Sequence, residues 1–178
     1  NLEEPEEQQK EVQRMLEQGV RSFVLAFSDE QVIRRILEKL KEQNCRVVLL
    51  SRDCPHNYEN YYVGVDYYRS GLLAAELLGK MLPQGGSIFI PVTAEYGNNR
   101  DIQARLQGFK EKLREFPACR ILPEVHELVE GKTVYREVCA CLKREPQLSG
   151  IFDLSYRLDM TAKALRGCGR EKIRLVGF

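Results

Sequence analysis

Side chains that can hold a polar small molecule follow the short apolar segments of this chain. They combine hydrogen-bonding groups with tyrosine rings, which offer flat faces for stacking. A few converging polar groups beside aromatic faces are typical of a small-molecule site, although loops are polar in any protein and each residue alone is more often an ordinary loop residue. These residues are Ser28, Asp29, Ser51, Arg52, Asp53, Asp66, Thr93, Tyr96, Glu124, His126, Asp153, Ser155 and Tyr156.

Sequence patterns that mark catalysis or cofactor binding do not occur in the chain. It has no G-x-G-x-x-G turn for a dinucleotide, no G-x-x-x-x-G-K-[ST] loop for a nucleotide phosphate and no G-x-S-x-G nucleophile turn. Only two histidines are present, His56 and His126, and no catalytic motif surrounds either. We therefore expect a protein that is not an enzyme and carries no cofactor.

Two short segments resemble fragments of a metal site, namely Cys54-Pro55-His56 and Cys139-Ala140-Cys141. Residues two apart on a helix point to different sides, and no second pair lies at zinc-finger spacing. We expect no metal ion.

The composition limits the partners and the compartment. Lys and Arg number 27 against 26 Asp and Glu, whereas a domain that binds DNA by itself normally carries a basic excess. No apolar run approaches the ~18 residues of a membrane span. Several of the six cysteines lie in apolar segments and the chain is not a short, loop-rich one, which favours reduced thiols and a cytoplasmic location.

Helical and strand-like apolar patterns alternate along the whole chain. Short apolar strands separated by amphipathic helices predict an α/β fold, with parallel sheets flanked by helices on both faces. Ligands bind beyond the carboxyl ends of such strands, which is where the polar residues lie. Strands are expected in two separate sheets, at 23–27, 47–50, 87–90, 121–124, 150–153 and 173–177, with an extended run at 62–65.

Helices are expected between these strands. Ser28 is expected to cap the second helix with Gln31 as its capping-box partner, and Pro83 to end the third. The apolar positions that mark the helices are Val12, Met15, Leu16 and Val20; Val32, Ile33, Ile36, Leu37 and Leu40; Leu72, Leu73, Leu77 and Leu78; Ile102, Leu106, Phe109 and Leu113; Val134, Val138, Cys141 and Leu142; and Leu158, Ala162 and Leu165.

Five segments, in order along nearly the whole chain, resemble the lac repressor and periplasmic sugar-binding protein superfamily. Residues 18–25 are similar to its helix followed by a "D-G-I-I-L" strand, and residues 46–52 to "P-V-V-L-I-D-R". Residues 62–71 are similar to "V-G-V-D-N-Y-x-A-G", residues 104–109 to "A-R-x-x-G-F" and residues 175–178 to "V-V-G-F-D".

This resemblance implies two similar α/β lobes, joined by three crossover strands, with the ligand between them. Residues 1–65 would be a partial N-terminal lobe that lacks the opening strand-helix-strand, and residues 66–178 the C-terminal lobe. The chain would then be part of a longer polypeptide whose second crossover begins just past Phe178. Because elements of the first lobe are missing, we expect that lobe to expose apolar faces that promote association.

The resemblance also implies a set of ligand-binding residues. Arg105 matches the family arginine that forks onto ligand hydroxyls, a task that suits the fixed donors of a guanidinium; the alternative is a solvated helix residue. Ser51 and Arg52 occupy the position of the family Asp-Arg pair, and only Arg52 matches it. Asp66 lies at the crossover, where it would contact the ligand or form hinge hydrogen bonds.

One departure from the family concerns the ligand. The chain has Ser155-Tyr156 where the family commonly has the Asn-Asp pair that grips sugar hydroxyls. Tyr156, Tyr96 and the tyrosines at 58, 61, 62, 67 and 68 offer rings for stacking instead. A sugar or sugar-like ligand is the expectation, although this departure disfavours an ordinary hexose or pentose.

The resemblance leaves two functions open. The first is the ligand-sensing domain of a lac repressor-type transcription regulator, a cytoplasmic homodimer that contacts operator DNA through a helix-turn-helix module absent from this chain. The alternative is an extracytoplasmic solute-binding receptor of a sugar transporter or sensor kinase. The cysteine content favours the first.

Overall fold

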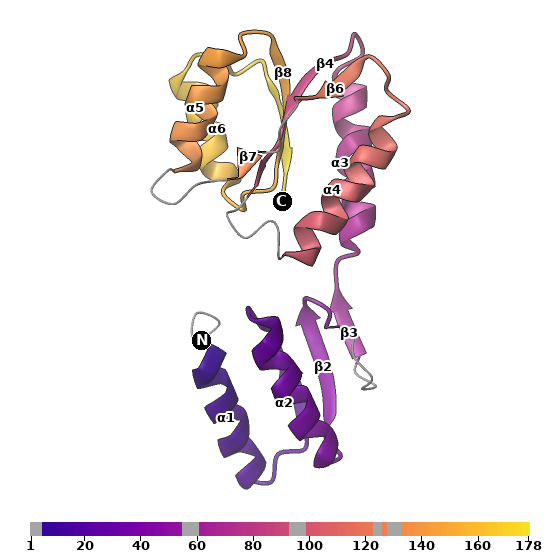
Figure 1. Cartoon of the computed structure of the whole chain (residues 1–178), viewed down its shortest axis with the longest axis vertical. Helices are drawn as coiled ribbons and strands as arrows, with labels where there is room; N and C mark the ends of the chain where they lie inside the picture. Colours follow the sequence, from indigo (N-terminus) through magenta and orange to yellow (C-terminus); the bar gives the residue numbers. More distant parts are fainter. Residues whose placement is uncertain (1–4, 55–60, 93–98, 123–125, 128–132) are drawn as a thin grey trace. The chain divides into compact units, whose positions relative to one another are not determined.

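A computed structural model describes residues 5–54, 61–92, 99–122, 126–127 and 133–178 (Figure 1). Within the chain, the backbone contacts separate two compact units, Asn1–Val65 and Asp66–Phe178. No helix among the described residues is both long enough and apolar enough to cross a bilayer.

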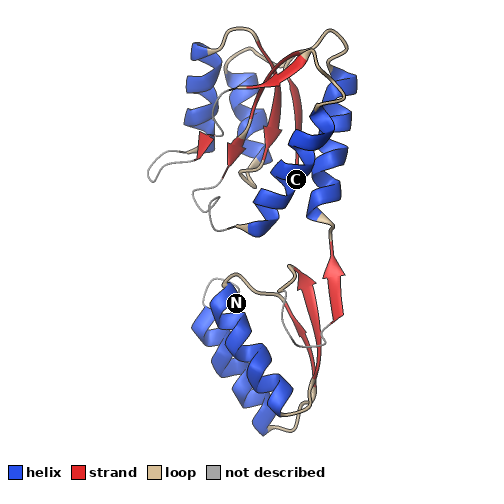
Figure 2. Cartoon of the chain, turned by 45° about the vertical axis from the view of Figure 1, so that its right-hand side comes forward, coloured by secondary structure: helices blue, strands red, loops and turns tan. Residues whose placement is uncertain are grey.

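The first unit is a three-stranded parallel sheet with two helices. Its elements in chain order are α1 (Pro5–Glu17), β1 (Ser22–Leu25), α2 (Glu30–Glu42), β2 (Arg46–Ser51) and β3 (Tyr61–Gly64). The strands lie in the order β1-β2-β3, and both helices lie against the same face of the sheet (Figure 2). The apolar face of α2 is completely buried there, as its spacing predicted.

The second unit contains a four-stranded parallel sheet with two helices on each face (Figure 1). Its strand order is β6-β4-β8-β9, and a separate parallel pair joins β5 to β7. The elements are α3 (Tyr67–Met81), β4 (Gly86–Phe89), β5 (Pro91–Val92), α4 (Arg100–Leu113), β6 (Cys119–Ile121), β7 (His126–Glu127), α5 (Val134–Arg144), β8 (Leu148–Asp153), α6 (Leu158–Gly167) and β9 (Arg174–Gly177).

Both faces of this sheet are apolar because successive strand residues point to opposite sides. Ile88 and Phe152 pack in the core that includes residues of α3 and α4. Their chain neighbours Phe89 and Ile151 pack in the core that includes residues of α5 and α6. A strand buried on both faces has apolar residues at successive positions, as in Ile88-Phe89 and Ile151-Phe152.

The predicted fold class is confirmed: the strands pair in parallel and form separate sheets in the two units. Several local predictions were wrong. Asp29, not Ser28, caps α2 by accepting a hydrogen bond from the Val32 amide, and Val20 lies beyond α1 and is exposed. The strand expected at 121–124 is β6, which ends at Ile121; residues 123–125 lie outside the described part of the chain.

Candidate functional site

Arg105 lies in the second turn of α4, and its side chain is brought into the interior of the second unit. Asn99 begins this helix by accepting hydrogen bonds from the amides of Asp101 and Ile102. The apolar face of α4 packs in the core, and Arg105, beside this face, is only 6% exposed. A buried guanidinium needs compensating contacts, because it leaves water at a high cost in free energy.

Aromatic rings supply much of this compensation. The guanidinium carbon of Arg105 lies 4.4 Å from the ring centre of Phe178 and 4.6 Å from that of Tyr67. The Tyr156 ring centre is 5.7 Å away. A cation within about 6 Å of a ring face is attracted by the negative charge of that face. These rings come from the start of α3, the turn between β8 and α6, and the residue after β9.

Two hydrogen bonds fix the orientation of the guanidinium. Nε of Arg105 donates to Oγ of Ser70 over 3.3 Å, and Nη1 donates to the Tyr156 hydroxyl over 3.2 Å. Ser70 in turn donates to the Tyr67 carbonyl oxygen. Nη2 has no hydrogen-bond partner among the residues that the structure describes. Arg105 therefore keeps N–H groups that can donate hydrogen bonds to a ligand oxygen.

Tyr156 adds a hydroxyl that can both donate and accept. Burial raises the pKa of this hydroxyl, although the charge of Arg105 opposes the rise. The phenol thus stays protonated at neutral pH, and while it accepts from Arg105 its own proton is available to a further acceptor.

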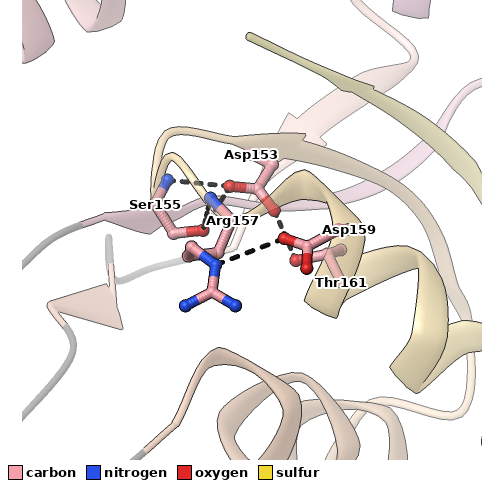
Figure 3. A network of polar contacts seen from close by, with 5 residues as sticks. All are labelled: Asp153, Ser155, Arg157, Asp159 and Thr161. Carbon is pink, nitrogen blue, oxygen red and sulfur yellow. Dashed lines mark hydrogen bonds and ion pairs between the residues drawn. The ribbon is translucent and has the colours of Figure 1, made fainter.

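A buried network shapes the turn that carries Tyr156 (Figure 3). Asp153, at the end of β8, is 2% exposed. One of its carboxylate oxygens accepts hydrogen bonds from the Ser155 amide over 2.7 Å and the Ser155 hydroxyl over 2.5 Å. The other accepts from the Thr161 hydroxyl in α6. The network holds a turn in which Tyr156 has a φ of +58°, a left-handed conformation that is uncommon for a residue with a side chain.

The first unit carries the predicted residues Ser51 and Arg52 at the carboxyl end of β2. The Arg52 guanidinium donates to the Ser28 carbonyl oxygen over 2.9 Å and lies 5.6 Å from the ring centre of Phe27. Ser51 has a φ of +72°, and its carbonyl oxygen accepts a hydrogen bond from the Tyr62 hydroxyl. The carboxyl ends of β1 and β2 thus meet in one polar corner.

The remaining predicted residues have different positions. Asp66 is exposed and caps α3, accepting a hydrogen bond from the Arg69 amide over 2.9 Å. Ser155 is buried, with its hydroxyl directed to Asp153. Tyr96 lies outside the described residues. Of the predicted set, the structure brings Arg105 and Tyr156 into direct contact, with Ser155 adjacent in the same turn.

The side chains in contact around Arg105 form a cluster, called here the Arg105 cluster: Arg105, Tyr67, Ser70, Tyr156 and Phe178. Two of these residues were not identified from the sequence. Ser70 lies one turn after Tyr67 on α3, and Phe178 follows directly after β9. The rule that ligands lie beyond the carboxyl ends of parallel strands would have selected Phe178. The described part of the chain contains no group of three or more His, Cys, Asp or Glu side chains able to hold a metal ion.

Comparison with known proteins places this geometry in a family context. A family model described as a periplasmic binding protein domain matches residues 3–178. A sugar-binding protein of a sugar ABC transporter from Bacillus halodurans is 22% identical with a TM-score of 0.86, covering 98% of this chain and 60% of that chain. No curated protein sequence matches.

Two further solved structures share the fold. An arabinose-binding protein from Geobacillus stearothermophilus is 18% identical with a TM-score of 0.83, covering 98% of this chain and 60% of that chain. The fructose-binding periplasmic domain of a hybrid two-component system is 18% identical with a TM-score of 0.78, covering 98% and 57%. The chain thus spans about three fifths of the length of these structures.

Proposed function

The chain belongs to the periplasmic binding protein domain family, as the five sequence segments predicted, and on this premise we propose that it is part of an extracytoplasmic receptor for a sugar or sugar-like polyol. The observation that carries the proposal is the guanidinium of Arg105, which is buried, lined by aromatic rings and has Nη2 available as a donor. Such a group offers charged donors in a fixed orientation to ligand hydroxyl oxygens.

The surroundings of Arg105 fit a ligand that is both polar and flat-faced. The rings of Tyr67, Tyr156 and Phe178 provide apolar surface on which the C–H face of a sugar or cyclic polyol packs. Arg105 and the Tyr156 hydroxyl provide hydrogen bonds to its rim. In the first unit, Ser51 and Arg52 form a polar corner of their own, and we propose that Asp66 serves to cap α3.

The receptor function, which was the alternative from sequence, is now preferred to the regulator. The three solved structures named above are two sugar-binding proteins, one of them from an ABC transporter, and a periplasmic sensor domain. The regulator interpretation depends on the cysteine content: no disulfide joins the six cysteines in this structure, which suits a reducing compartment. Cytoplasmic location, homodimer formation and operator binding stay predictions of that second interpretation.

Substitution of Arg105 tests the ligand site. The ligand is first found by thermal-shift screening of pentoses, hexoses and cyclic polyols, since a bound ligand raises the melting temperature. In the whole protein, Arg105→Ala then removes charged donors from ligand hydroxyls, a loss of roughly 1.5–3 kcal/mol or about ten- to more than a hundredfold in affinity. Titration calorimetry measures the loss.

Arg114→Ala is the matched control. Arg114 is the exposed C-cap residue of the same helix, so this change removes the same charge at a distance from the cluster. We expect its affinity to stay near that of the wild type. If the two variants lost the same affinity, Arg105 would act only through its positive charge and not through direct contact with the ligand. The site assignment would then fail.

The location of the whole protein has a separate test. A secretion signal encoded upstream of Asn1 supports the receptor, whereas a helix-turn-helix module followed by a linker supports the regulator.

A further inference from the structure

Two cysteines far apart in the sequence meet between α5 and α6. Cys139 lies on α5, and Cys168 directly follows α6 as its C-cap residue. Their sulfur atoms are 3.1 Å apart, although the residues are 29 positions apart in the chain. The two helices pack side by side against one face of the four-stranded sheet (Figure 1).

This pair differs from the other four cysteines in its accessibility. Cys45, Cys54, Cys119 and Cys141 are buried, whereas Cys139 and Cys168 are both partly exposed. Buried thiols act as small apolar groups and are inert, while reaction requires access to the sulfur. The chain thus has one pair of cysteines, among those described, that are both accessible and in contact.

We propose that Cys139 and Cys168 form a redox site, which a low-molecular-weight disulfide such as oxidised glutathione converts to an intramolecular disulfide that joins α5 to α6. A disulfide has a sulfur–sulfur distance of about 2.05 Å. The two sulfur atoms, 3.1 Å apart, therefore need to approach by about 1 Å to form the bond.

The reaction balances as two successive thiol–disulfide exchanges. One protein thiol loses its proton and attacks a sulfur of oxidised glutathione, which releases one glutathione thiolate and leaves a mixed disulfide. The second protein thiol, already in contact, loses its proton and attacks the protein sulfur of that mixed disulfide. The second glutathione thiolate leaves. The protein pair is oxidised by two electrons, and one oxidised glutathione becomes two reduced molecules.

The local environment tunes this reaction. Burial and the neighbouring Cys168 raise the pKa of the Cys139 thiol, although a hydrogen bond with Tyr135 opposes the rise. Less thiolate is then present at neutral pH, which slows the attack of Cys139 on an oxidant. Two neighbouring thiols can also bind a metal ion, but among the described residues no third metal ligand lies beside Cys139 and Cys168.

The disulfide would act on the segment that carries Tyr156. The loop that it closes contains β8, the Asp153–Tyr156 turn and the whole of α6. Closing a loop of this length restricts the unfolded chain and thereby stabilises the folded unit. Oxidation is therefore expected to raise the melting temperature of the protein, by roughly 5 °C or more.

Mass spectrometry under non-reducing conditions tests the proposal. The reduced protein is incubated with oxidised glutathione at about pH 8, where more thiolate is present; free thiols are then alkylated and the chain is cut with trypsin. Cleavage at Lys and Arg gives peptide 137–143, which holds Cys139 and Cys141, and peptide 167–170, which holds Cys168. We expect these two peptides linked, lighter by two hydrogens, with fragment ions that place the alkyl group on Cys141.

A single cysteine variant supplies the control. In Cys139→Ser the remaining Cys168 should stop at the glutathione adduct, and the melting temperature should not rise after oxidation. Separate adducts on Cys139 and Cys168 in the wild-type protein, or a bond from Cys168 to Cys141, would overturn the proposal. An oxidised wild-type protein whose melting temperature equals that of the reduced one would overturn the proposed stabilisation.

Discussion

At the scale of single residues, Asp153 organises the turn on which the Arg105 cluster depends. Its buried carboxylate accepts three hydrogen bonds, two from Ser155 and one from Thr161 (Figure 3). Hydrogen bonds to a charged acceptor contribute more than neutral ones. An exposed carboxylate, Asp159, lies in the first turn of α6 and forms an ion pair with Arg157.

We predict that Asp153→Asn destabilises the second unit by roughly 1.5–3 kcal/mol, because an amide offers one acceptor oxygen where the carboxylate offers two. Urea unfolding of the two proteins measures the difference. Asp159→Asn removes the same charge from the start of α6 but breaks only an exposed ion pair, which contributes little to stability. If the two variants were equally destabilised, the buried network would not be what holds the turn.

The sequence drew attention to some residues around Arg105 but not to the contacts that they make. Arg105 was found because it lies in a recognisable motif, A-R-x-x-G-F. Its contacts with Ser70 and Tyr156 join residues 35 and 51 positions away, and such contacts depend on how α3 and the β8–α6 turn pack. Ser155 was selected by its position in the sequence, but local spacing could not indicate that its hydroxyl donates to Asp153.

At the scale of secondary-structure elements, the alignment of the cluster depends on how closely α3 and α4 approach. Two glycines permit this approach. A Cβ atom at Gly71 would lie 2.0 Å from the Arg105 carbonyl oxygen, and one at Gly108 would lie 2.1 Å from that of Tyr68. The helices therefore touch backbone to backbone, directly beside Ser70 and Arg105.

Gly71→Ala is predicted to destabilise the protein, although alanine is normally favoured over glycine within a helix by about 1 kcal/mol. A clash with backbone cannot be relieved by a side-chain rotation, so α3 and α4 must separate, at a cost of roughly 1–3 kcal/mol beyond that gain. Thermal unfolding and ligand titration should both show losses, since Ser70 moves away from Arg105.

Gly167→Ala in α6 is the comparison for this variant. A Cβ atom there would meet the Tyr135 hydroxyl at 2.6 Å, which is the far end of a side chain that can turn aside. We expect a much smaller change in melting temperature. A stabilised Gly71→Ala protein would show that the helices are free to separate.

The same pair of helices shows what hydrophobic periodicity can and cannot predict. The apolar face of α4 was predicted completely, because it consists of large residues at regular spacing. In α3, Leu73 and Leu77 helped to mark the helix but are exposed. Its buried face consists largely of small residues, including Gly71, Ala74 and Ala75, which give no clear signal because close helix packing selects for size.

At the scale of the whole chain, the alternating pattern predicted parallel sheets, and the exposed apolar face that was expected in residues 1–65 is present. The two central strands of the second unit's main sheet, β4 and β8, are largely apolar and buried. In the first unit, by contrast, both helices cover one face of the sheet (Figure 2), and the opposite face contains exposed apolar residues. Val24 is 67% exposed, Val63 57% and Leu50 43%.

Strand register places these residues together on that face. Leu50 of β2 pairs with Val63 of β3, and Val24 of β1 pairs with Val48, two residues before Leu50. Side chains two apart on a strand point to the same side. β1 and β3 each pair with β2 alone among the described strands, so the sheet also presents two edges. An apolar face with open edges is a surface on which chains associate.

We therefore predict that the 178-residue chain self-associates in a concentration-dependent way, and that the combined change Val24→Lys and Val63→Lys reduces this association. Two charges on the face must lose their hydration whenever another chain covers it. Light scattering coupled to size-exclusion chromatography, over a hundredfold range of concentration, gives the mass of the species present. Leu73→Lys with Leu77→Lys is the control, because these exposed leucines lie on α3, in the other unit. A monomer at every concentration would contradict the prediction. An equal reduction by the control pair would move the contact to α3 and leave the sheet face without a role in association.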